Sequence, residues 1–283
     1  MKSKNVRKII ILTIFILTPC LCVLYGYFEA RHIVIKKITF SHNDIPESFN
    51  GKKIIFISDI HCDNYFPVKK VADLVDIINE RNPDIIIIGG DNVRKDTTYF
   101  TPFFKEISNL KSKYGVYTVL GNHDHWEDPQ LIQQGFRDCK FYICDNQGYW
   151  IKEDNDSIRI GGVGDFWEDK QLLENTTQDV KKSDFCILLS HNPDYMENLN
   201  SNLVDLVLSG HTHGGQITLL GLWAPIMPSS MHPEYLQTGQ KYRYGWKEKD
   251  NIRVYITSGI GMGGFPFRFF APPEIVEFTL SNK

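Results

Sequence analysis

The stretch IIIIGGDN, residues 85–92, joins four consecutive isoleucines to two glycines, an aspartate and an asparagine. A short apolar run bounded by glycine and rich in β-branched residues is typical of a strand that is buried on both faces. Polar groups directly after such a strand lie at the edge of the sheet, and ligands of open α/β sheets bind at the carboxyl ends of the strands. The stretch therefore predicts an α/β fold with functional side chains at this edge.

The same arrangement recurs after the apolar runs that end at residues 57, 120, 189 and 208. The polar residues that follow the five runs are Asp59, His61, Asp91, Asn122, His123, Asp124, His191, His211 and His213. Carboxylate, imidazole and amide groups together suit Mn, Zn or Fe, whereas oxygen ligands alone suit Mg or Ca. Because these groups exceed the three or four that one ion needs, we expect two divalent ions that share a carboxylate, with Mn²⁺ favoured.

The remaining segments indicate the rest of the fold. Strands and helices are predicted to alternate at 53–58, 68–80, 84–88, 100–110, 115–120 and 129–136, which implies parallel strand pairs with crossover helices. Shorter strands that can supply a second sheet are predicted at 149–152, 157–161, 185–190, 204–209, 216–219, 253–257 and 274–280. The segment 220–250 is rich in Pro, Gly and aromatic residues and is predicted to be a long surface loop.

Residues 9–28 contain no charged side chain over twenty positions. This length suits a membrane-spanning helix, which needs about 20 apolar residues. A cleaved signal peptide is the main alternative, but the run is long for one and no small-x-small cleavage site follows it. A buried core helix is the third interpretation.

Basic residues before this run favour a cytoplasmic N-terminus and an extracytoplasmic domain, although Arg31, Lys36 and Lys37 after it weaken the asymmetry. We therefore expect a single-pass protein of the cell membrane. Its expected parts are a basic N-terminus at 1–8, an anchor at 9–28, a stalk and edge strand at 29–52, and the main domain at 53–283.

The overall charge and the cysteine content exclude few classes of function. The 31 Lys and Arg against 34 Asp and Glu give a net charge of −3, which disfavours nucleic acid as the partner. The six cysteines show no CxxC spacing outside the apolar run, and a Cys139–Cys144 disulfide is left open.

Five motifs stand in the order and spacing of one family: Asp59-x-His61, Gly90-Asp91, Gly121-Asn122-His123-Asp124, His191 and Gly210-His211-Thr212-His213. From about Lys53 onward, the chain resembles the calcineurin-like metallophosphoesterases. Later stretches resemble the membrane-associated bacterial subfamily typified by YkuE and YaeI: Gly214 to Ile217, Gly259 to Arg268, and Pro273-Glu274-Ile275. We expect a four-layer α/β/β/α sandwich of two mixed β-sheets flanked by helices, preceded by the transmembrane helix.

The resemblance implies hydrolysis of a phosphodiester or pyrophosphate bond by a hydroxide that bridges the two metals. Some relatives cleave UDP-2,3-diacylglucosamine, and together with the anchor this favours a lipid-linked substrate. By the same resemblance, Asp59, His61 and His213 hold one metal, Asn122, His191 and His211 hold the other, and Asp91 bridges both. His123 is expected to face the phosphate, and Asp124 to orient the His123 imidazole.

Several interpretations stay open. Arg268 is a candidate for binding the substrate phosphate, with an ion-pair role as the alternative. Cys62 stands where many members of the family have glycine, and it is expected to pack rather than to bind metal. Aromatic and aliphatic residues of two stretches are expected to be ordinary core, with an acyl-chain groove or contact with the bilayer as the alternative; they are Leu222, Trp223, Ile226, Met227, Phe265, Phe267, Phe269 and Phe270.

Two other classes of function compete with a lipid-directed hydrolase. One is a binding scaffold that keeps the fold without turnover, and the other is a soluble nuclease or cyclic-nucleotide phosphodiesterase. The stretch 259–264 matches a dinucleotide-binding glycine pattern, but Pro266 follows closely and no helix is predicted there.

Overall fold

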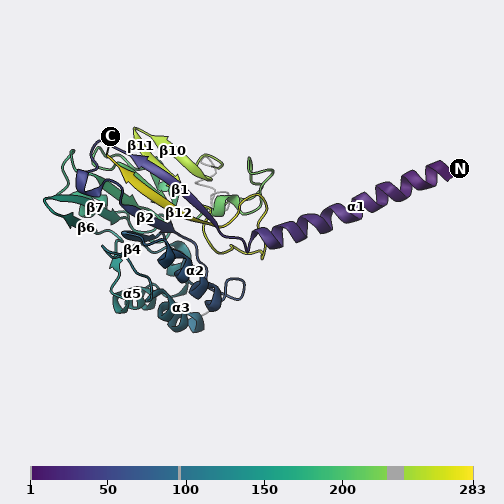
Figure 1. Cartoon of the computed structure of the whole chain (residues 1–283), viewed down its shortest axis with the longest axis horizontal. Helices are drawn as coiled ribbons and strands as arrows, with labels where there is room; N and C mark the ends of the chain where they lie inside the picture. Colours follow the sequence, from purple (N-terminus) through teal and green to yellow (C-terminus); the bar gives the residue numbers. More distant parts are fainter. Residues whose placement is uncertain (1, 95–96, 228–238, 283) are drawn as a thin grey trace.

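The computed structural model describes residues 2–94, 97–227 and 239–282. A long helix, α1 (Lys2–Glu29), extends away from a domain in which two sheets and several helices pack together (Figure 1). Its segment Ile10–Glu29 is long and apolar enough to cross a membrane, and only 6% of that window is buried against the rest of the protein. This exposure argues against a buried core helix, because a core helix would be covered by its neighbours.

The first sheet has the strand order β1-β12-β2-β3-β4-β5. These strands are β1 (Val34–Ser41), β2 (Lys53–Ile57), β3 (Ile85–Ile88), β4 (Val116–Thr118), β5 (Tyr142–Ile143) and β12 (Glu274–Ser281). β12 runs antiparallel to β2, and the other neighbouring pairs are parallel. Alternate residues face opposite sides, so Ile54 and Phe56 enter one core while Ile55 and Ile57 enter another.

The second sheet has the order β10-β11-β9-β8-β7-β6. Its strands are β6 (Gly148–Glu153), β7 (Asp156–Gly162), β8 (Cys186–Leu189), β9 (Leu206–Ser209), β10 (Gly245–Lys249) and β11 (Ile252–Ile256). The two outer pairs, β10–β11 and β6–β7, are antiparallel, and the inner pairs are parallel. Both sheets are therefore mixed.

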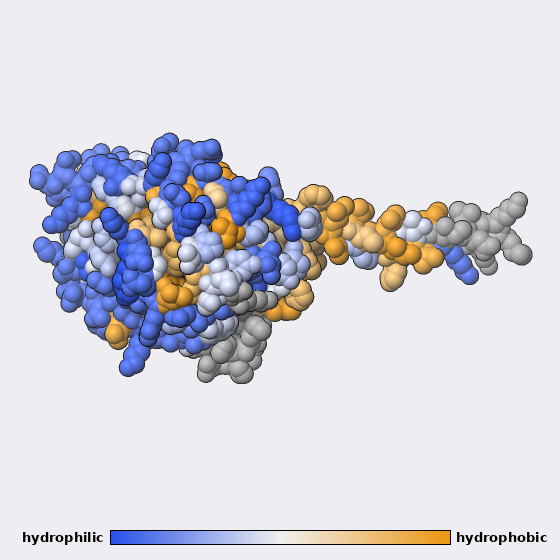
Figure 2. All heavy atoms as spheres, turned by 90° about the horizontal axis from the view of Figure 1, so that it is seen from below, coloured by the Kyte–Doolittle hydropathy of each residue, from blue (hydrophilic) through white to orange (hydrophobic). Residues whose placement is uncertain are grey.

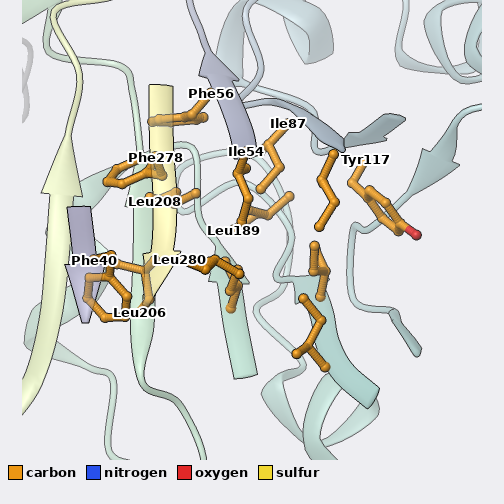
Figure 3. Packing of buried hydrophobic residues seen from close by; sticks show 14 of the residues in the cluster. Phe40, Ile54, Phe56, Ile87, Tyr117, Leu189, Leu206, Leu208, Phe278 and Leu280 are labelled. Atoms are coloured by element: carbon orange, nitrogen blue, oxygen red, sulfur yellow. The ribbon is translucent and has the colours of Figure 1, made fainter. Parts of the chain in front are cut away.

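The main core lies between the two sheets. Figure 3 shows Phe56, Ile54 and Ile87 of the first sheet packed near Leu189 and Leu208 of the second. The outer face of the first sheet is covered by α2 (Val68–Glu80), α3 (Phe100–Ile107) and α5 (Pro129–Asp138). Shorter elements cover the second sheet, namely α6 (Leu173–Thr177), the 3-10 turn η3 (Pro193–Glu197) and loops. The four-layer sandwich of two mixed sheets is thus confirmed.

Some local predictions were wrong. The predicted loop 220–250 contains the edge strand β10, whose sequence GWKEK lacks an apolar run because the strand is only partly buried. The predicted strand 216–219 forms only isolated bridges, since Gln216 and Thr218 donate side-chain hydrogen bonds to the backbone of residues 265–270. Residues 228–238 of the predicted loop lie outside the described residues.

Several short elements were not predicted at all: α4 (Asn122–Glu127), β5, α6, and the 3-10 turns η1 (Glu47–Phe49), η2 (Thr97–Tyr99) and η4 (His213–Gly215). Each has at most six residues, too few to show a period in the sequence. α4 matters most, because it carries three of the residues singled out above.

Candidate metal centre

The seven predicted metal ligands come from the loops that follow five strands. Asp59 and His61 follow β2, Asp91 follows β3, Asn122 opens α4 after β4, His191 follows β8, and His211 and His213 follow β9. All seven side chains are buried, although all are polar. Because β2, β3 and β4 are parallel within one sheet and β8 and β9 within the other, the loops after them meet at one end of the sandwich.

The backbone of these loops is strained. Left-handed φ angles occur at five of the seven predicted ligands: Asp59 (54°), His61 (45°), Asp91 (56°), His211 (68°) and His213 (51°). Such a conformation costs a non-glycine residue about 1–3 kcal/mol and persists only where the surrounding structure holds it. Here the His211 amide donates to the Asp59 carboxylate over 3.0 Å, and the His61 amide donates to the Asp91 carbonyl over 3.0 Å. Strain concentrated in this way is characteristic of a functional site.

One group of ligand atoms is formed by Asp59, His61 and His213. The Nε2 atoms of His61 and His213 are 3.1 Å apart, and Nε2 of His213 is 3.7 Å from Oδ1 of Asp59. Two nitrogens that each lie about 2.1 Å from a common ion are roughly 3 Å apart. The three side chains are therefore spaced to bind one cation.

A second group is formed by Asn122, His191 and His211. Nδ1 of His211 lies 2.9 Å from Oδ1 of Asn122. Nδ1 of His191 lies 2.7 Å from the carbonyl oxygen of Gly89, to which it can donate. That bond leaves Nε2 directed into the site, as in metal-binding histidines that are oriented by a backbone carbonyl. Before a metal binds, the carboxylate of Asp91 raises the pKa of His191 well above its usual value, so metal binding would displace a proton from Nε2.

Asp91 lies between the two groups. Its Oδ2 atom is 3.3 Å from Nε2 of His191 and 3.5 Å from Nε2 of His61. Its Oδ1 atom accepts a hydrogen bond of 2.9 Å from the His123 amide, which fixes the carboxylate. A single carboxylate oxygen is thus placed next to both groups, the position that a bridging ligand requires.

Glycine is needed next to two of the ligands because space is short. A Cβ atom on Gly121 would overlap the carboxylate of Asp91, and one on Gly210 would overlap the side chains of Ser58 and Asp59. These glycines let the loops of the two sheets approach closely enough for the ligand atoms to converge.

Burial and neighbouring charges together set the charge of the ligands. It lowers the pKa of His61 and of His213 well below the usual value, so both imidazoles are held in the neutral form that binds metals. Burial also raises the pKa of Asp59 to about 7, and the nearby charge of Asp91 adds to this effect. Burial alone would raise the pKa of Asp91 too, but His191 and His123 hold it well below its usual value. Bound cations would relieve the cost of crowding these carboxylates.

A pocket of about 360 Å³ opens over Asp91 and Asn122. The half-buried imidazole of His123 lines it and lies edge-on to the rings of His61, 4.8 Å away, and Trp126, 4.5 Å away. One of its ring nitrogens lies within 4.8 Å of ligand atoms of His61 and Asp91. The resemblance assigns His123 to the substrate and not to a metal.

The hydrogen bonds of Asp124 go to groups other than the imidazole that it was expected to orient. Its carboxylate accepts hydrogen bonds of 2.8–3.0 Å from the amides of Gly121, Asp91 and Asn92 and from the Asn92 side chain. Within the described residues, no hydrogen bond joins it to the His123 ring. Adjacent residues of a helix point in different directions, and Asp124 turns inward from α4 while His123 faces the pocket. Asp124 holds together the loops that follow β3 and β4.

Arg268 is likewise not placed to bind substrate, because its side chain is fully buried. Its guanidinium donates to the carbonyls of Gly261 and Ala271 and lies 3.4 Å from Nδ1 of His213. Burial lowers the pKa of Arg268 to about 10. The arginine supports the loop that carries His213 instead of facing the pocket.

Three pocket residues were missed at the sequence level: Arg94, Trp126 and Trp167. Arg94 is 8% exposed and donates to the carbonyl of Met262 over 3.2 Å. Its position three residues after Asp91 was the only available signal. Trp126 had a comparable signal, because it stands three residues after His123. Trp167 lies five residues after β7 and belongs to no motif.

Cys62 is buried in the core on the helical side of the first sheet. Burial raises the pKa of its thiol to about 12, so the thiolate that would bind a metal is disfavoured. Its role in packing is consistent with the prediction. All six cysteines, Cys139 and Cys144 included, are free.

Known proteins that are similar to this chain are metallophosphoesterases, the family that its motifs resemble. A family model described as calcineurin-like phosphoesterase matches residues 52–215. The uncharacterized metallophosphoesterase YkuE of Bacillus subtilis (strain 168) is 31% identical over 265 residues, which cover 91% of this chain and 90% of YkuE. The phosphodiesterase YaeI of Escherichia coli (strain K12) is 28% identical, with 90% and 89% covered. A Danio rerio relative, named transmembrane protein with metallophosphoesterase domain, is 27% identical, with 84% and 55% covered.

Proposed function

Because this chain belongs to the calcineurin-like phosphoesterases, a family of metal-dependent enzymes, we propose that it is a membrane-anchored dinuclear phosphohydrolase that cleaves a phosphodiester or pyrophosphate bond. The observation that supports this most is the position of Asp91, whose Oδ2 atom is within 3.5 Å of ligand nitrogens from both groups. A single-ion site would need no shared carboxylate.

The donor atoms of the candidate ligands suit divalent transition metals. Asp59, His61 and His213 would hold one ion, Asn122, His191 and His211 the other, and Asp91 both. A mixed set of nitrogen and oxygen donors suits Mn²⁺, which we favour, or Zn²⁺ or Fe. When bound, a pair of such ions neutralises the charge of the phosphate and supplies an activated water.

His123 would act on the substrate. Its imidazole lines the pocket beside the ligand atoms, so an N–H can reach a phosphoryl oxygen or deliver a proton to the leaving group. Asp124 is a positioning residue that keeps Asp91 and the start of α4 in register. Arg94 replaces Arg268 as the candidate for binding the substrate phosphate, because Arg94 lines the pocket whereas Arg268 does not. The Arg94 guanidinium also donates to the Met262 carbonyl and lies 3.8 Å from the Asp63 carboxylate, which holds it at the pocket wall.

We further propose that α1 anchors the enzyme and that the substrate is lipid-linked, with UDP-2,3-diacylglucosamine as the first candidate. Apolar residues Ile226 and Phe265 line the pocket together with the polar ones, which suits a substrate with an apolar part. The intact mass of protein extracted from membranes separates an anchor from a cleaved signal peptide. Protease access in sealed cells tests the extracytoplasmic placement of the domain.

Hydrolysis of bis-p-nitrophenyl phosphate with added Mn²⁺ tests the proposed activity. Wild type is expected to release nitrophenol, while Asp91→Ala and His123→Ala lose most of the rate. Equal background rates in all three proteins would instead indicate a binding scaffold.

Parallel assays with UDP-2,3-diacylglucosamine, cyclic nucleotides and single-stranded DNA test the substrate class. Turnover is expected to be fastest on the lipid-linked compound. Preference for either water-soluble class would overturn the lipid proposal but not the phosphoesterase chemistry.

A further inference from the structure

We infer that an exposed apolar surface beside α1 enters the lipid bilayer, so that the pocket opens at the boundary between lipid and water. The surface, called here the apolar rim, consists of Leu219, Leu220, Leu222, Trp223, Ile226 and Phe265. These side chains are 52–80% exposed. The inference rests on the proposed membrane anchoring and deepens it, because it gives the domain itself a place in the membrane.

Hydrogen bonds hold the segments that carry the rim in a fixed conformation, so its side chains are exposed in an ordered part of the protein. The Phe269 amide donates to the Gln216 carbonyl over 2.8 Å, and the Thr218 amide donates to the Phe269 carbonyl over 2.9 Å. The side-chain amide of Gln216 donates to the Phe265 carbonyl over 3.0 Å. Two segments distant in sequence are thus joined, and they present large apolar side chains together. Contiguous apolar surface of this kind marks an interaction site, whereas scattered single residues do not.

The contacts of α1 indicate that the occupant is a bilayer. The ring of Tyr25 lies 5.3 Å from the rings of both Phe269 and Phe270. The Arg268 amide donates to the Gly26 carbonyl over 3.1 Å. The last turns of the apolar helix are therefore packed on the segment that follows Phe265. In Figure 2, apolar side chains cover α1 and continue onto the part of the domain next to its base.

The end of α1 marks the level of the membrane surface. Tyr25, Tyr27 and Phe28 are exposed on its last turns, and aromatic residues of this kind gather where lipid meets water. Two charged groups stand at the same end: the Glu29 carboxylate accepts a hydrogen bond of 2.6 Å from the Tyr25 hydroxyl, and the guanidinium of Arg31 lies 3.4 Å from the centre of the Tyr27 ring. A bilayer that covers α1 as far as Phe28 therefore reaches the rim, where Trp223 supplies a further interfacial aromatic.

The position of the rim has a consequence for access to the site. Ile226 and Phe265 belong both to the rim and to the lining of the pocket, which also includes Asp91 and His123. The pocket thus connects the ligand groups with the surface that faces lipid. The phosphate group of a lipid ester can therefore reach His123 while the apolar part of the ester stays in the bilayer.

Quenching by brominated lipid tests the contact directly. The full chain is placed in nanodiscs of ordinary or brominated phosphatidylcholine, and tryptophan emission is compared for wild type and Trp223→Phe. We expect bromine to quench wild type and the substitution to remove at least half of the quenched emission. Equal fractional quenching of the two proteins would overturn the inference.

A second comparison uses turnover and paired charge substitutions. Leu220 and Leu222 do not line the pocket, so Leu220→Asp with Leu222→Asp should leave hydrolysis of bis-p-nitrophenyl phosphate within twofold of wild type. Hydrolysis of a p-nitrophenyl phosphodiester carried on diacylglycerol in the nanodisc should fall at least tenfold. The control pair, Leu131→Asp with Leu172→Asp, also changes exposed leucines but lies outside the rim and should affect neither rate. The inference would be contradicted if the rim pair and the control pair lost the same fraction of the rate, or if the rim pair kept its rate on the lipid-borne ester.

Failure of the proposed function is distinguishable from failure of this inference. If wild type hydrolyses neither ester with Mn²⁺, the catalytic proposal fails, whereas the quenching experiment still tests the rim. If quenching of Trp223 is absent, the bilayer is excluded as the occupant of the rim, whether or not the ester is hydrolysed.

Discussion

Folded proteins usually bury apolar side chains and expose polar ones, and the ligand loops and the apolar rim are two exceptions of opposite kind. At the metal centre, seven polar side chains are buried with strained backbone, and at the rim, six large apolar side chains are exposed on an ordered framework. Buried polar groups and contiguous exposed apolar groups are the informative exceptions in a folded protein. We infer from the first exception that the buried polar groups bind cations, and from the second that the exposed apolar groups contact lipid.

The two regions also differ in how they are held. The ligand loops depend on buried side chains, chiefly Asp124 with its four hydrogen bonds and Arg268 behind His213. The rim depends mainly on backbone hydrogen bonds between residues 216–219 and the 265–270 loop. Substitutions in the first region should therefore affect every substrate and the fold, and those in the second only substrates in the membrane.

The largest effect is expected for Asp91→Ala. Loss of the shared carboxylate should lower kcat on a soluble ester about a thousandfold or more, equivalent to roughly 4 kcal/mol of barrier. Elemental analysis should show less than two ions per chain. Asp76→Ala removes an exposed carboxylate from α2 and is the matched control, expected to keep both activity and metal. Full metal content with normal activity in Asp91→Ala would remove the bridging role.

His123→Ala should come next, with kcat lowered about a hundredfold. The metal content is expected to match wild type, because His123 lies outside both ligand groups. His125→Ala, two residues along the same helix and outside the pocket lining, is the control. Loss of bound metal in His123→Ala would show that the imidazole is a ligand and not a group that acts on substrate.

Asp124→Asn tests the positioning role. An amide cannot accept all the hydrogen bonds that the carboxylate accepts, so the free energy of unfolding should fall by about 2–3 kcal/mol, measured by denaturant titration. If Asp124 instead acted on His123, stability would be unchanged and only the pH profile of hydrolysis would shift.

Arg268→Met should have a smaller effect, also on stability. The methionine fills much of the space but leaves the carbonyls of Gly261 and Ala271 without their donor, which costs about 1–2 kcal/mol. KM for a soluble ester should stay within twofold. A tenfold rise in KM at unchanged stability would restore Arg268 as a substrate-binding residue.

Leu222→Asp should have the smallest effect of all on the soluble enzyme activity and on stability. A surface substitution of this kind changes the free energy of unfolding by about 0.5 kcal/mol or less. A larger loss of stability would show that Leu222 packs within the domain, and the contrast between the two regions would then disappear.

The convergence of the seven candidate ligands was predictable because each of them follows a strand whose apolar run is visible in the sequence. Runs such as Ile54 to Ile57 bury both faces, so their ends and the residues after them could be placed with little ambiguity. The family pattern then assigned the ligands to two groups, and the distances around Asp91 agree with that assignment.

The roles of Asp124 and Arg268 were not predictable in the same way. The direction of Asp124 depends on α4, a helix too short to be recognised from periodicity. A fully buried arginine follows no local pattern, because its partners are backbone carbonyls. The rim was visible as an apolar composition, but composition alone does not separate core from surface, and the expectation of ordinary core packing is wrong for its exposed members.

Anomalous diffraction from crystals of the full chain grown with Mn²⁺ tests the convergence of the seven side chains most directly. We expect two manganese peaks about 3.5–4 Å apart, with an oxygen of Asp91 in contact with both. A single peak, or peaks remote from these residues, would contradict the dinuclear site.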